Sequence, residues 1–417
     1  MQQLKSWLQR TVLYRIYLQV VKRYRFWVQD HKYARVYRRY AKAPVKERKV
    51  LFLEIHHPQL SNSFRAVYAA LEQSGGFELQ SHFLLHTTTS PKQQRKVFLR
   101  FLKELATAQA LFLDEGTDLL SHVPVRPETR VTQLWHGCGA FKRFGLSVAD
   151  RKFGADAAYM KAHPFHSHYT LVTVSSPEVV WAYEEAMGYT HESGVVQPIG
   201  VSRTDVFFDD GFLRAAKAHL LAAVPNAKGR RVLFYAPTFR GNIREAAAPT
   251  ALDAERLMGA LGSDWVLLIK HHPHVKRRPP IPKSCEDCVF DVTETMTIED
   301  LLCVSDVCIS DYSSLVFEYS LFERPMLFLA DDLDDYFDWR GFYYDYHALA
   351  PGPVVTTTDE VIDVLTHLDE RFDPGRVKAF KEKFMSACDG HATERILELA
   401  MGPDVLAANK KSGAAEA

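Results

Sequence analysis

Short apolar runs alternate with longer amphipathic stretches along the chain from Lys49 onward. The short runs are typical of buried strands, and they fall at residues 50–55, 77–85, 110–113, 131–135, 171–174, 232–235, 265–269, 288–291, 307–309 and 326–329. Between most of them apolar residues recur at helical spacing, as they do at 91–107, 177–187 and 210–223. Strands and helices in alternation predict parallel sheets with helices on both faces. This many strands fit two α/β domains better than one.

The same pattern divides the chain into five segments. An arm at 1–48 precedes two Rossmann-like parallel-sheet domains, at 49–195 and 196–372. Helices within 373–402 can cross back onto the first domain. The small and polar tail at 403–417 is expected to be disordered.

The chain has no net charge, but its charges are unevenly distributed. Residues 1–49 contain 14 Lys or Arg and two acidic residues, a net of +12, so the remaining residues carry a net of −12. The arm also contains many aromatic residues: Trp7, Tyr14, Tyr17, Tyr24, Phe26, Trp27, Tyr33, Tyr37 and Tyr40. It has neither the apolar run of a signal peptide nor the roughly 20-residue apolar span of a membrane helix.

A helix with basic residues on one side and Trp, Tyr and Leu on the other can lie in the interface of an anionic bilayer. We therefore expect residues 1–48 to contact an anionic membrane surface. A solvated helix packed on the protein body is the alternative that stays open. No nucleic-acid recognition motif follows the arm, so we expect no nucleic-acid partner.

Neither the cysteines nor the acidic residues form a clear metal site. Only Cys285 and Cys288 of the six cysteines have Cys-x-x-Cys spacing, and a zinc knuckle needs two more ligands. We therefore expect free thiols and a reducing compartment. Four aspartates between residues 331 and 335 could suggest Mg²⁺, but a solvated acidic loop is the simpler interpretation. We expect no metal.

Polar residues that can bind phosphate or move a proton follow several of the predicted strands. His136 follows the strand at 131–135, and Thr238 and Arg240 follow the strand at 232–235. The strand at 265–269 runs into Lys270-His271-His272-Pro273-His274. In open parallel sheets ligands bind at the carboxyl ends of strands, so we expect these side chains to line a cleft.

The segment Ile309-Ser310-Asp311-Tyr312-Ser313-Ser314 joins a predicted strand to a predicted helix over 315–322. Its Ser and Asp side chains can accept hydrogen bonds from the first backbone N–H groups of that helix. The same N–H groups, with the helix dipole behind them, can instead hold a phosphate. The turn therefore predicts either simple helix capping or a diphosphate cradle.

Five motifs occur in order between about residues 130 and 350. They are Gln133-Leu134-Trp135-His136-Gly137, Gly200-Val201-Ser202-Arg203-Thr204-Asp205, Tyr235-Ala236-Pro237-Thr238-Phe239-Arg240, Lys270-His271-His272-Pro273, and the series Ser310 to Ser314, Arg324-Pro325 and Arg340-Gly341. In this order they resemble the motifs of the CDP-glycerol glycerophosphotransferases, which are the teichoic acid primases and polymerases. Residues Cys138-Gly139-Ala140 replace the Thr-Pro-Leu that is common in polymerase members.

The resemblance implies a GT-B-like fold, in which the first Rossmann-like domain binds the acceptor, the second binds CDP-glycerol, and the two face a cleft. It implies transfer of glycerol phosphate from CDP-glycerol to a hydroxyl of a lipid-linked or polymeric glycan, or of a polyol phosphate acceptor, with release of CMP. The product would be teichoic acid or a capsule-like cell-surface polymer of a bacterium. CDP-glycerol is then a donor substrate, and no cofactor is expected. Peripheral attachment at the cytoplasmic face of the cell membrane is implied as well.

The resemblance also implies roles for individual residues. His136 is the expected general base, and His272 is expected to donate to a phosphate oxygen or the leaving group, with His271 and His274 as rivals. Asp311 either holds a ribose hydroxyl or orients His272. The expected donor-binding residues are Arg203, Asp205, Thr238, Arg240, Lys270, Asp311, Ser313, Ser314, Arg340 and Gly341.

Several alternatives stay open at the level of the sequence. The same scaffold can use CDP-ribitol or a nucleotide sugar, and a non-catalytic relative can act as a membrane-bound scaffold. The presence of His136, Arg240 and His272 with the Ser pair argues against a non-catalytic role. The identity of the acceptor, the choice between primase and polymerase, and homo-oligomer formation are left open.

Overall fold

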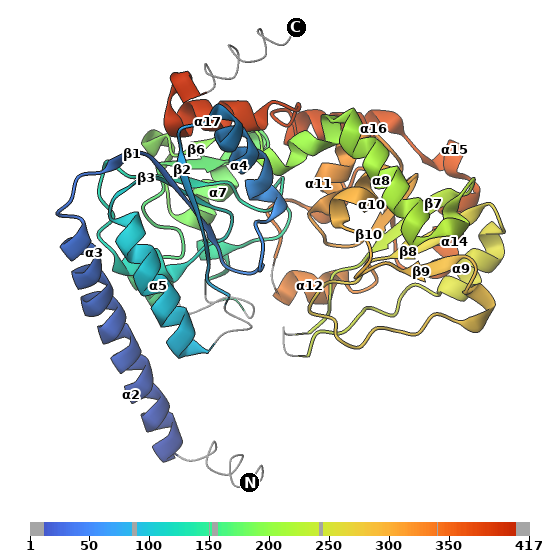
Figure 1. Ribbon diagram of the computed structural model, residues 1–417. Coiled ribbons are helices and arrows are strands. Elements are labelled where there is room, and N and C mark those ends of the chain that lie inside the picture. Colours follow the sequence, from blue (N-terminus) through green and yellow to red (C-terminus); the bar gives the residue numbers. More distant parts are fainter. Residues whose placement is uncertain are drawn as a thin grey trace, which may run out of the picture. The chain divides into compact units, whose positions relative to one another are not determined.

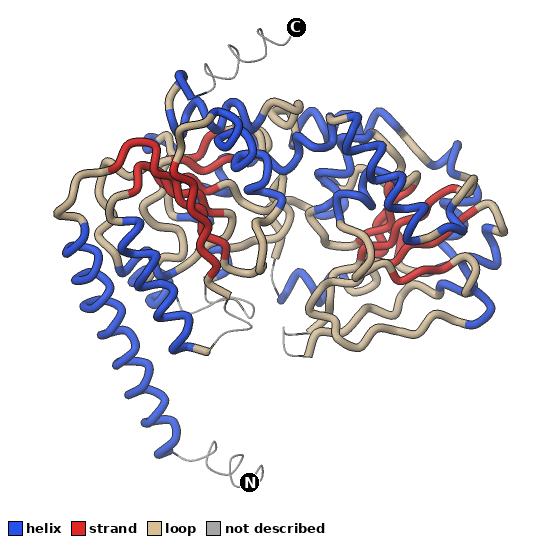
Figure 2. The backbone as a smooth tube through the Cα atoms, in the orientation of Figure 1, coloured by secondary structure: helices blue, strands red, loops and turns tan. Residues whose placement is uncertain are grey.

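The computed structural model describes residues 12–85, 90–149, 151, 157–241, 245–339 and 341–405. Its strands form two six-stranded sheets, and neighbouring strands with a defined register run parallel. Helices flank both sheets (Figure 1, Figure 2). The prediction of an α/β protein with two parallel sheets is therefore confirmed.

The first sheet comes from the N-terminal half of the chain. Its strands are β1 (Lys46–Glu54), β2 (Glu78–Phe83), β3 (Ala108–Leu113), β4 (Arg130–Gln133), β5 (Leu171–Thr173) and β6 (Val196–Gln197). They lie in the order β2-β1-β3-β4-β5-β6. The connections contain α4 (Asn62–Ser74), α5 (Pro91–Leu105), η2 (Asp118–His122), η3 (Gly145–Val148), α6 (Ala157–Ala162), η4 (Pro177–Val179), α7 (Val180–Met187) and η5 (His191–Ser193).

The second sheet follows a link formed by η6 (Ser202–Phe208), α8 (Asp210–Ala223) and η7 (Pro225–Ala227). Its strands are β7 (Arg231–Ala236), β8 (Trp265–Ile269), β9 (Val289–Asp291), β10 (Val307–Ser310), β11 (Met326–Leu329) and β12 (Val354–Val355). They lie in the order β12-β11-β10-β7-β8-β9. The connections contain α9 (Ala254–Leu261), η8 (Lys283–Cys285), α10 (Ile298–Val304), α11 (Leu315–Tyr319), η9 (Ser320–Phe322), α12 (Leu333–Trp339) and α13 (Tyr346–Leu349). After the sheet come α14 (Thr358–Thr366), α15 (Leu368–Arg371), α16 (Pro374–Phe384), α17 (Ala392–Met401) and η10 (Pro403–Val405).

Local signals in the sequence set where several elements begin. Asp209 accepts hydrogen bonds from the backbone N–H groups of Gly211 and Phe212, so α8 begins where its apolar spacing predicts. Ser90 and Gln93 form a capping box at the start of α5. All five residues of β8 are buried, which explains why this strand is a continuous apolar run rather than an alternating one.

The core of the second sheet has one apolar layer across its four central strands. Leu233, Leu267, Ile309 and Leu327 come from β7, β8, β10 and β11, and each is at most 1% exposed. Leu257 of α9 and Val361 of α14 belong to the same cluster. Burying this layer stabilises a rigid sheet whose strand ends can hold side chains in fixed positions.

The chain forms two compact units. Unit 1 contains Met1–Leu134, Ala158–Val172 and Leu397–Ala417, and unit 2 contains Trp135–Ala157 and Thr173–Ile396. The predicted domain boundaries at 195 and 372 rest on strand and helix alternation alone and stay predictions. Of the predicted tail, the structure describes η10, and residues from 406 onward lie outside the described part.

The described part of the arm contains three successive helical segments, α2 (Val12–Val28), the π-helical turn η1 (Gln29–Tyr33) and α3 (Ala34–Tyr40). Tyr37 of α3 is buried, and its hydroxyl accepts a hydrogen bond from the backbone N–H of Arg126. In contrast, α2 exposes several large apolar side chains: Ile16, Tyr17, Val20, Val21, Tyr24 and Trp27. Within the described part of the chain, no helix combines the length and the hydropathy that a membrane span requires. Trp7 of the predicted aromatic set lies outside the described residues.

Candidate active site

The order of strands in the second sheet reverses between β7 and β10. From β7 the chain moves outward to β8 and β9, and from β10 it moves outward in the other direction to β11 and β12. β7 and β10 run parallel, and their last residues, Ala236 and Ser310, are partners in the register. In doubly wound sheets, the crevice at such a reversal is where ligands bind.

A pocket of about 300 Å³ opens beside these strand ends, a size in the range of small-ligand sites. Its lining comes from η6, β7, α10 and α11, from the loops that follow β7, β8 and β10, and from the loop that carries His136. The lining residues are His136, Arg203, Ala236, Pro237, Thr238, Lys270, His271, His272, Pro273, Ile298, Ser313, Ser314, Leu315 and Glu318. Seven of the twelve predicted site residues are among them: His136, Arg203, Thr238, Lys270, His272, Ser313 and Ser314.

The loop that carries His136 packs closely on α11. Trp135, just before the histidine, has φ 59°, a left-handed backbone conformation that is uncommon for a bulky residue. Gly139 has φ 64°, and a Cβ at this position would come within 2.3 Å of the ring of Phe317. A Cβ on Gly137 would lie 3.5 Å from the hydroxyl of Ser314. The contact at Gly137 would be an ordinary one, so it is Gly139 that lets the loop approach α11, and His136 and Ser314 line the same pocket.

Arg203 lines the pocket, but its guanidinium binds other groups of the protein, including the His136 loop. Its guanidinium donates a hydrogen bond to the carbonyl oxygen of His136. Its other nitrogens lie 2.8 Å from a carboxylate oxygen of Glu299 and 2.9 Å from one of Glu318. Burial raises the pKa of Glu318 to about 7, while Arg203 opposes the rise and Glu299 adds to it. We refer to Arg203, Glu299 and Glu318 as the arginine clamp.

Asp311 joins the ends of β7 and β10. Its buried carboxylate accepts hydrogen bonds from the backbone N–H and hydroxyl of Thr238, at 2.9 Å each, and from the N–H of Tyr312 at 2.6 Å. Arg240 donates to the same carboxylate at 3.0 Å and to Asp332 at 2.5 and 2.9 Å. Of the two predicted roles for Asp311, orienting His272 or binding ribose, neither corresponds to these contacts. Asp332 is thus bound to Arg240 and not part of a purely solvated acidic loop.

The histidines after β8 differ in environment. Burial is the main cause that lowers the pKa of His272 to about 4, and the charges of His274 and Lys142 contribute to the same shift. The backbone N–H of His274 donates to Nδ1 of His272 at 3.2 Å. His272 is therefore neutral near pH 7, and because Nδ1 accepts, Nε2 carries the proton. His271 is buried, and its pKa is also lowered by burial.

Lys270 contributes a cation to the pocket wall. Its ammonium donates to the carbonyl oxygens of Thr293 and Met296, at 2.9 and 2.7 Å. Burial lowers its pKa, and neighbouring carboxylates, first that of Glu299, oppose the shift. The hydrogen bonds to carbonyls fix the ammonium without neutralising it, so its charge remains available to an anion.

Four predicted donor-binding residues that the structure describes do not line the pocket. Arg240 and Asp311 lie behind it and hold Thr238. Asp205 accepts hydrogen bonds from the backbone N–H groups of Ala392 and Thr393 at the start of α17, so its carboxylate caps that helix. Gly341 has φ 81°, and its carbonyl accepts from the N–H of Arg143. Arg340 lies outside the described residues.

Residues 35–402 match the family model described as CDP-Glycerol:Poly(glycerophosphate) glycerophosphotransferase. The chain belongs to this family. The resemblance seen in its sequence motifs is thus confirmed, and the chain is a transferase of teichoic acid biosynthesis, which serves the cell wall.

Curated relatives include enzymes for both polyols. The teichoic acid ribitol-phosphate primase of Bacillus spizizenii (strain ATCC 23059 / NRRL B-14472 / W23) is 34% identical over 370 residues, which cover 85% of this chain and 91% of the primase. The teichoic acid glycerol-phosphate primase of Bacillus subtilis (strain 168) is 27% identical, over 73% of this chain and 74% of that enzyme. A solved structure of the wall teichoic acid polymerase TagF superimposes with a TM-score of 0.73 at 20% identity, covering 94% of this chain and 97% of that chain. At this sequence identity, the similarity to TagF is evidence for the fold alone.

Sequence reasoning missed the two carboxylates of the arginine clamp. Glu299 and Glu318 lie in helical segments, where an isolated glutamate is normally an exposed residue. One signal was present, because Glu318 is in the middle of the apolar run Leu315 to Leu321. A lone acid in such a run is buried when the helix is buried, and a buried acid needs a cation.

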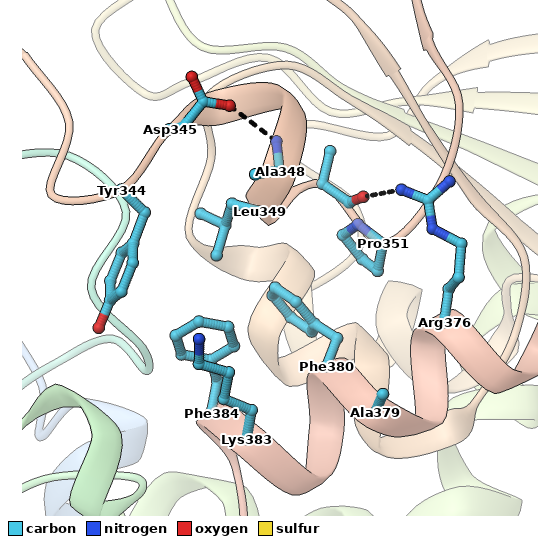
Figure 3. A pocket seen from close by; sticks show the side chains of 11 residues that line it. Tyr344, Asp345, Ala348, Leu349, Pro351, Arg376, Ala379, Phe380, Lys383 and Phe384 are labelled. Carbon is cyan, nitrogen blue, oxygen red and sulfur yellow. Dashed lines mark hydrogen bonds between the residues drawn. The ribbon is translucent and has the colours of Figure 1, made fainter.

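A second pocket of about 340 Å³ in unit 2 contains none of the predicted site residues (Figure 3). It lies between α16 and the segment around α13, with Phe380 and Leu349 among its apolar residues. The polar groups drawn there bond to the protein itself: Asp345 accepts from the N–H of Ala348, and Arg376 donates to the carbonyl of Ala350. Of these two pockets, the one beside β7 and β10 contains predicted site residues and is therefore the candidate for the transferase site.

Proposed function

We propose that the protein transfers a polyol phosphate from a CDP-polyol to an acceptor hydroxyl and releases CMP. The observation that carries this proposal is the gathering of His136, Lys270, His272 and the Ser313-Ser314 pair around one pocket at the strand reversal. A base, a cation and several hydrogen-bond donors in one pocket are what displacement on a diphosphate requires.

In the proposed step, the acceptor hydroxyl gives its proton to His136, and its oxygen attacks the β-phosphorus. A new P–O bond forms, the bond from the β-phosphorus to the oxygen bridging the two phosphates breaks, and CMP leaves with the electron pair. Lys270 and the Nε2–H of His272 stabilise the negative charge that develops on the departing phosphate. The hydroxyls of Ser313 and Ser314 donate to the same phosphate. The step uses no cofactor in this proposal.

Of the two polyols, the relatives favour ribitol over the glycerol expected from the motifs. Four ribitol-phosphate enzymes are 32–34% identical to this chain. Four glycerol-phosphate enzymes are 24–29% identical. We therefore take CDP-ribitol as the donor and CDP-glycerol as the second candidate.

The acceptor in this proposal is a lipid-linked glycan or polyol phosphate at the cytoplasmic face of the membrane. Peripheral attachment through the arm would bring the pocket to such an acceptor, and the exposed aromatic side chains of α2 support this part. In this proposal the enzyme has a GT-B-like arrangement, in which unit 1 binds the acceptor and unit 2 binds the donor.

The test is a donor panel. CDP-ribitol, CDP-glycerol and two UDP-sugars are each incubated with the protein and a lipid-linked acceptor, and nucleotide release is measured. CMP should be released from CDP-ribitol with a kcat/KM on the order of tenfold or more above that for CDP-glycerol, because ribitol offers two further hydroxyls, each contributing roughly 1 kcal/mol when hydrogen-bonded. Equal use of both CDP-polyols would overturn the choice of ribitol. Release from a UDP-sugar alone would overturn the proposed function.

A further inference from the structure

Three side chains of types that commonly bind metals meet in unit 1, and none of them belongs to a motif that suggested the function. Asp30 lies in η1, His122 is the last residue of η2, and His163 follows α6. One ligating atom from each side chain lies within 4.8 Å of the corresponding atoms of the other two. Three segments distant in sequence therefore contribute one ligand each.

His122 is buried, and only one of its two ring nitrogens has a hydrogen-bond partner among the described residues. Its Nδ1 lies 2.5 Å from a carboxylate oxygen of Asp30, while its Nε2 is buried and makes no hydrogen bond among the described residues. The ring of His163 lies 4.8 Å from that of His122 and stacks on Phe26 at 4.9 Å and 9°. The imidazole nitrogens are thus held in an apolar, aromatic surround, while Asp30 has 45% of its side chain exposed.

We propose that Asp30, His122 and His163 bind a divalent metal ion of the zinc class. Two imidazoles and one carboxylate form a ligand set that suits Zn²⁺, and the exposed side at Asp30 leaves room for water as a fourth ligand. Mg²⁺ and Ca²⁺ fit poorly, because they prefer several oxygen ligands and this set offers one carboxylate. If Nδ1 of His122 binds the ion, the proton of the neutral imidazole is carried by Nε2, so no net proton release is required.

The ion would fasten the arm to unit 1. Asp30 lies in the π-helical turn that joins α2 to α3, whereas His122 and His163 belong to the body of the unit. π-helical turns are rare and are found frequently at functional sites. Metal binding would therefore fix the point from which α2 extends, independently of the function proposed for the other unit.

The test uses the full chain after treatment with a chelator. Calorimetric titration with Zn²⁺ alone should show one site that is lost or weakened at least about tenfold in His163→Phe, since even losing an outer hydrogen-bond partner of a metal ligand costs about ten- to a hundredfold. The phenylalanine keeps the aromatic stack on Phe26 but has no ligating nitrogen. Asp30→Asn should weaken binding likewise, because it keeps a hydrogen-bond acceptor for His122 and removes the charge.

A matched control is His191→Ala, which removes an exposed histidine elsewhere and should leave the titration unchanged. Loading with Co²⁺ should give the visible absorption of a four- or five-coordinate ion in the wild type only. Zn²⁺ should also slow hydrogen exchange in Gln29–Tyr33 of the wild type and not of His163→Phe. Equal Zn²⁺ affinity in the wild type, His163→Phe and Asp30→Asn, or no binding by the wild type, would overturn the proposal.

Discussion

Trp135 and His136 illustrate how a single turn depends on distant residues. The left-handed conformation of Trp135 is costly for a bulky side chain and persists only when its surroundings fix it. Those surroundings are α11, which the loop approaches through Gly139, and Arg203, which binds the carbonyl of His136. The sequence could identify His136, because an apolar run ends there. The sequence could not identify the role of Arg203, because it does not show whether an arginine binds carboxylates of the same protein or binds a ligand phosphate.

His136→Ala should lower turnover by about 10² to 10⁴, the range typical of a lost general base. Donor binding should change little, because Lys270 and the Ser313-Ser314 pair remain. Steady-state CMP release gives the turnover, and calorimetry with the CDP-polyol gives the affinity. His191→Ala, at an exposed position, is the control for a histidine lost elsewhere. Wild-type turnover in the His136 variant would remove this residue from the mechanism.

His272 should titrate with a pKa of about 4, below its ordinary value of 6.5. The folded state then binds fewer protons than the unfolded state between these two values, so the free energy of unfolding decreases as pH falls from about 6.5 to about 4. His272→Phe should reduce this loss, because phenylalanine does not titrate. NMR titration of the imidazole checks the pKa, and melting temperatures across the same pH range check the slope. A pKa near 6.5 would show that His272 is not held neutral.

At the scale of elements, the arginine clamp ties η6 to α10 and α11. Glu299 and Glu318 are both nearly fully buried, and the single positive charge of Arg203 lies within ion-pair distance of both carboxylates. Removing one partner of a buried ion pair is usually strongly destabilising, so a substitution here must keep the charge. The clamp joins two helices beside the pocket to the loop of His136, which makes Arg203 a positioning residue.

Arg203→Lys should lower kcat by roughly tenfold or more, because a point charge cannot bind two carboxylates and a carbonyl in the geometry of a guanidinium. The affinity for the CDP-polyol should stay within about twofold of the wild-type value on this account, since the two hydrogen bonds that a donor phosphate would need are already used. Single-turnover kinetics and calorimetry separate the two quantities. A large loss of donor affinity with unchanged kcat would instead make Arg203 a donor-binding residue.

The helical segments of the arm differ in environment. Tyr33 and Tyr37 are buried in unit 1, and β1 begins at Lys46, so removing residues 1–48 would cut into the core. Substitution of the exposed face is therefore the better test. Tyr17, Tyr24 and Trp27 are each 57–62% exposed on α2.

A triple change of these three residues to serine should weaken binding to anionic vesicles while leaving the fold intact. Binding of the wild type should fall as salt rises, because the charges of the arm are screened within about 10 Å at 0.1 M salt. Part of it should persist, because aromatic side chains also bury apolar area. Vesicle sedimentation measures both. If the wild type and the triple variant sediment equally, α2 does not attach the protein to membranes through this face.

At the scale of the whole molecule, the order of strands decides which motifs meet. Residues 235–240 and 310–314 are distant in sequence, and they adjoin because β7 and β10 are neighbours. The strand positions could be predicted from apolar runs, and the two short edge strands that the prediction missed, β6 and β12, contain only two residues each. The order of the strands could not be predicted in this way, since it depends on packing between elements and not on local pattern.

The same limit explains why some predicted donor-binding residues do not line the pocket. Strand ends indicate that a side chain lies near the crevice, but they do not say whether it faces the pocket or another part of the protein. Thr238 and Arg240, two residues apart after β7, illustrate this: Thr238 lines the pocket, whereas Arg240 binds Asp311 and Asp332. Asp205, in η6, instead accepts a hydrogen bond from the backbone N–H of Thr393 at the start of α17.

Following the two phosphorus atoms of the donor tests the central claim most directly. CDP-ribitol is labelled with ³²P at either the α- or the β-phosphorus and incubated with the protein and a lipid-linked acceptor, with His136→Ala as the inactive control. Attack at the β-phosphorus predicts that the β-label moves to the lipid fraction and that the α-label stays in CMP. Recovery of the α-label in the lipid fraction, or of neither label under conditions in which the protein is folded, would contradict the account.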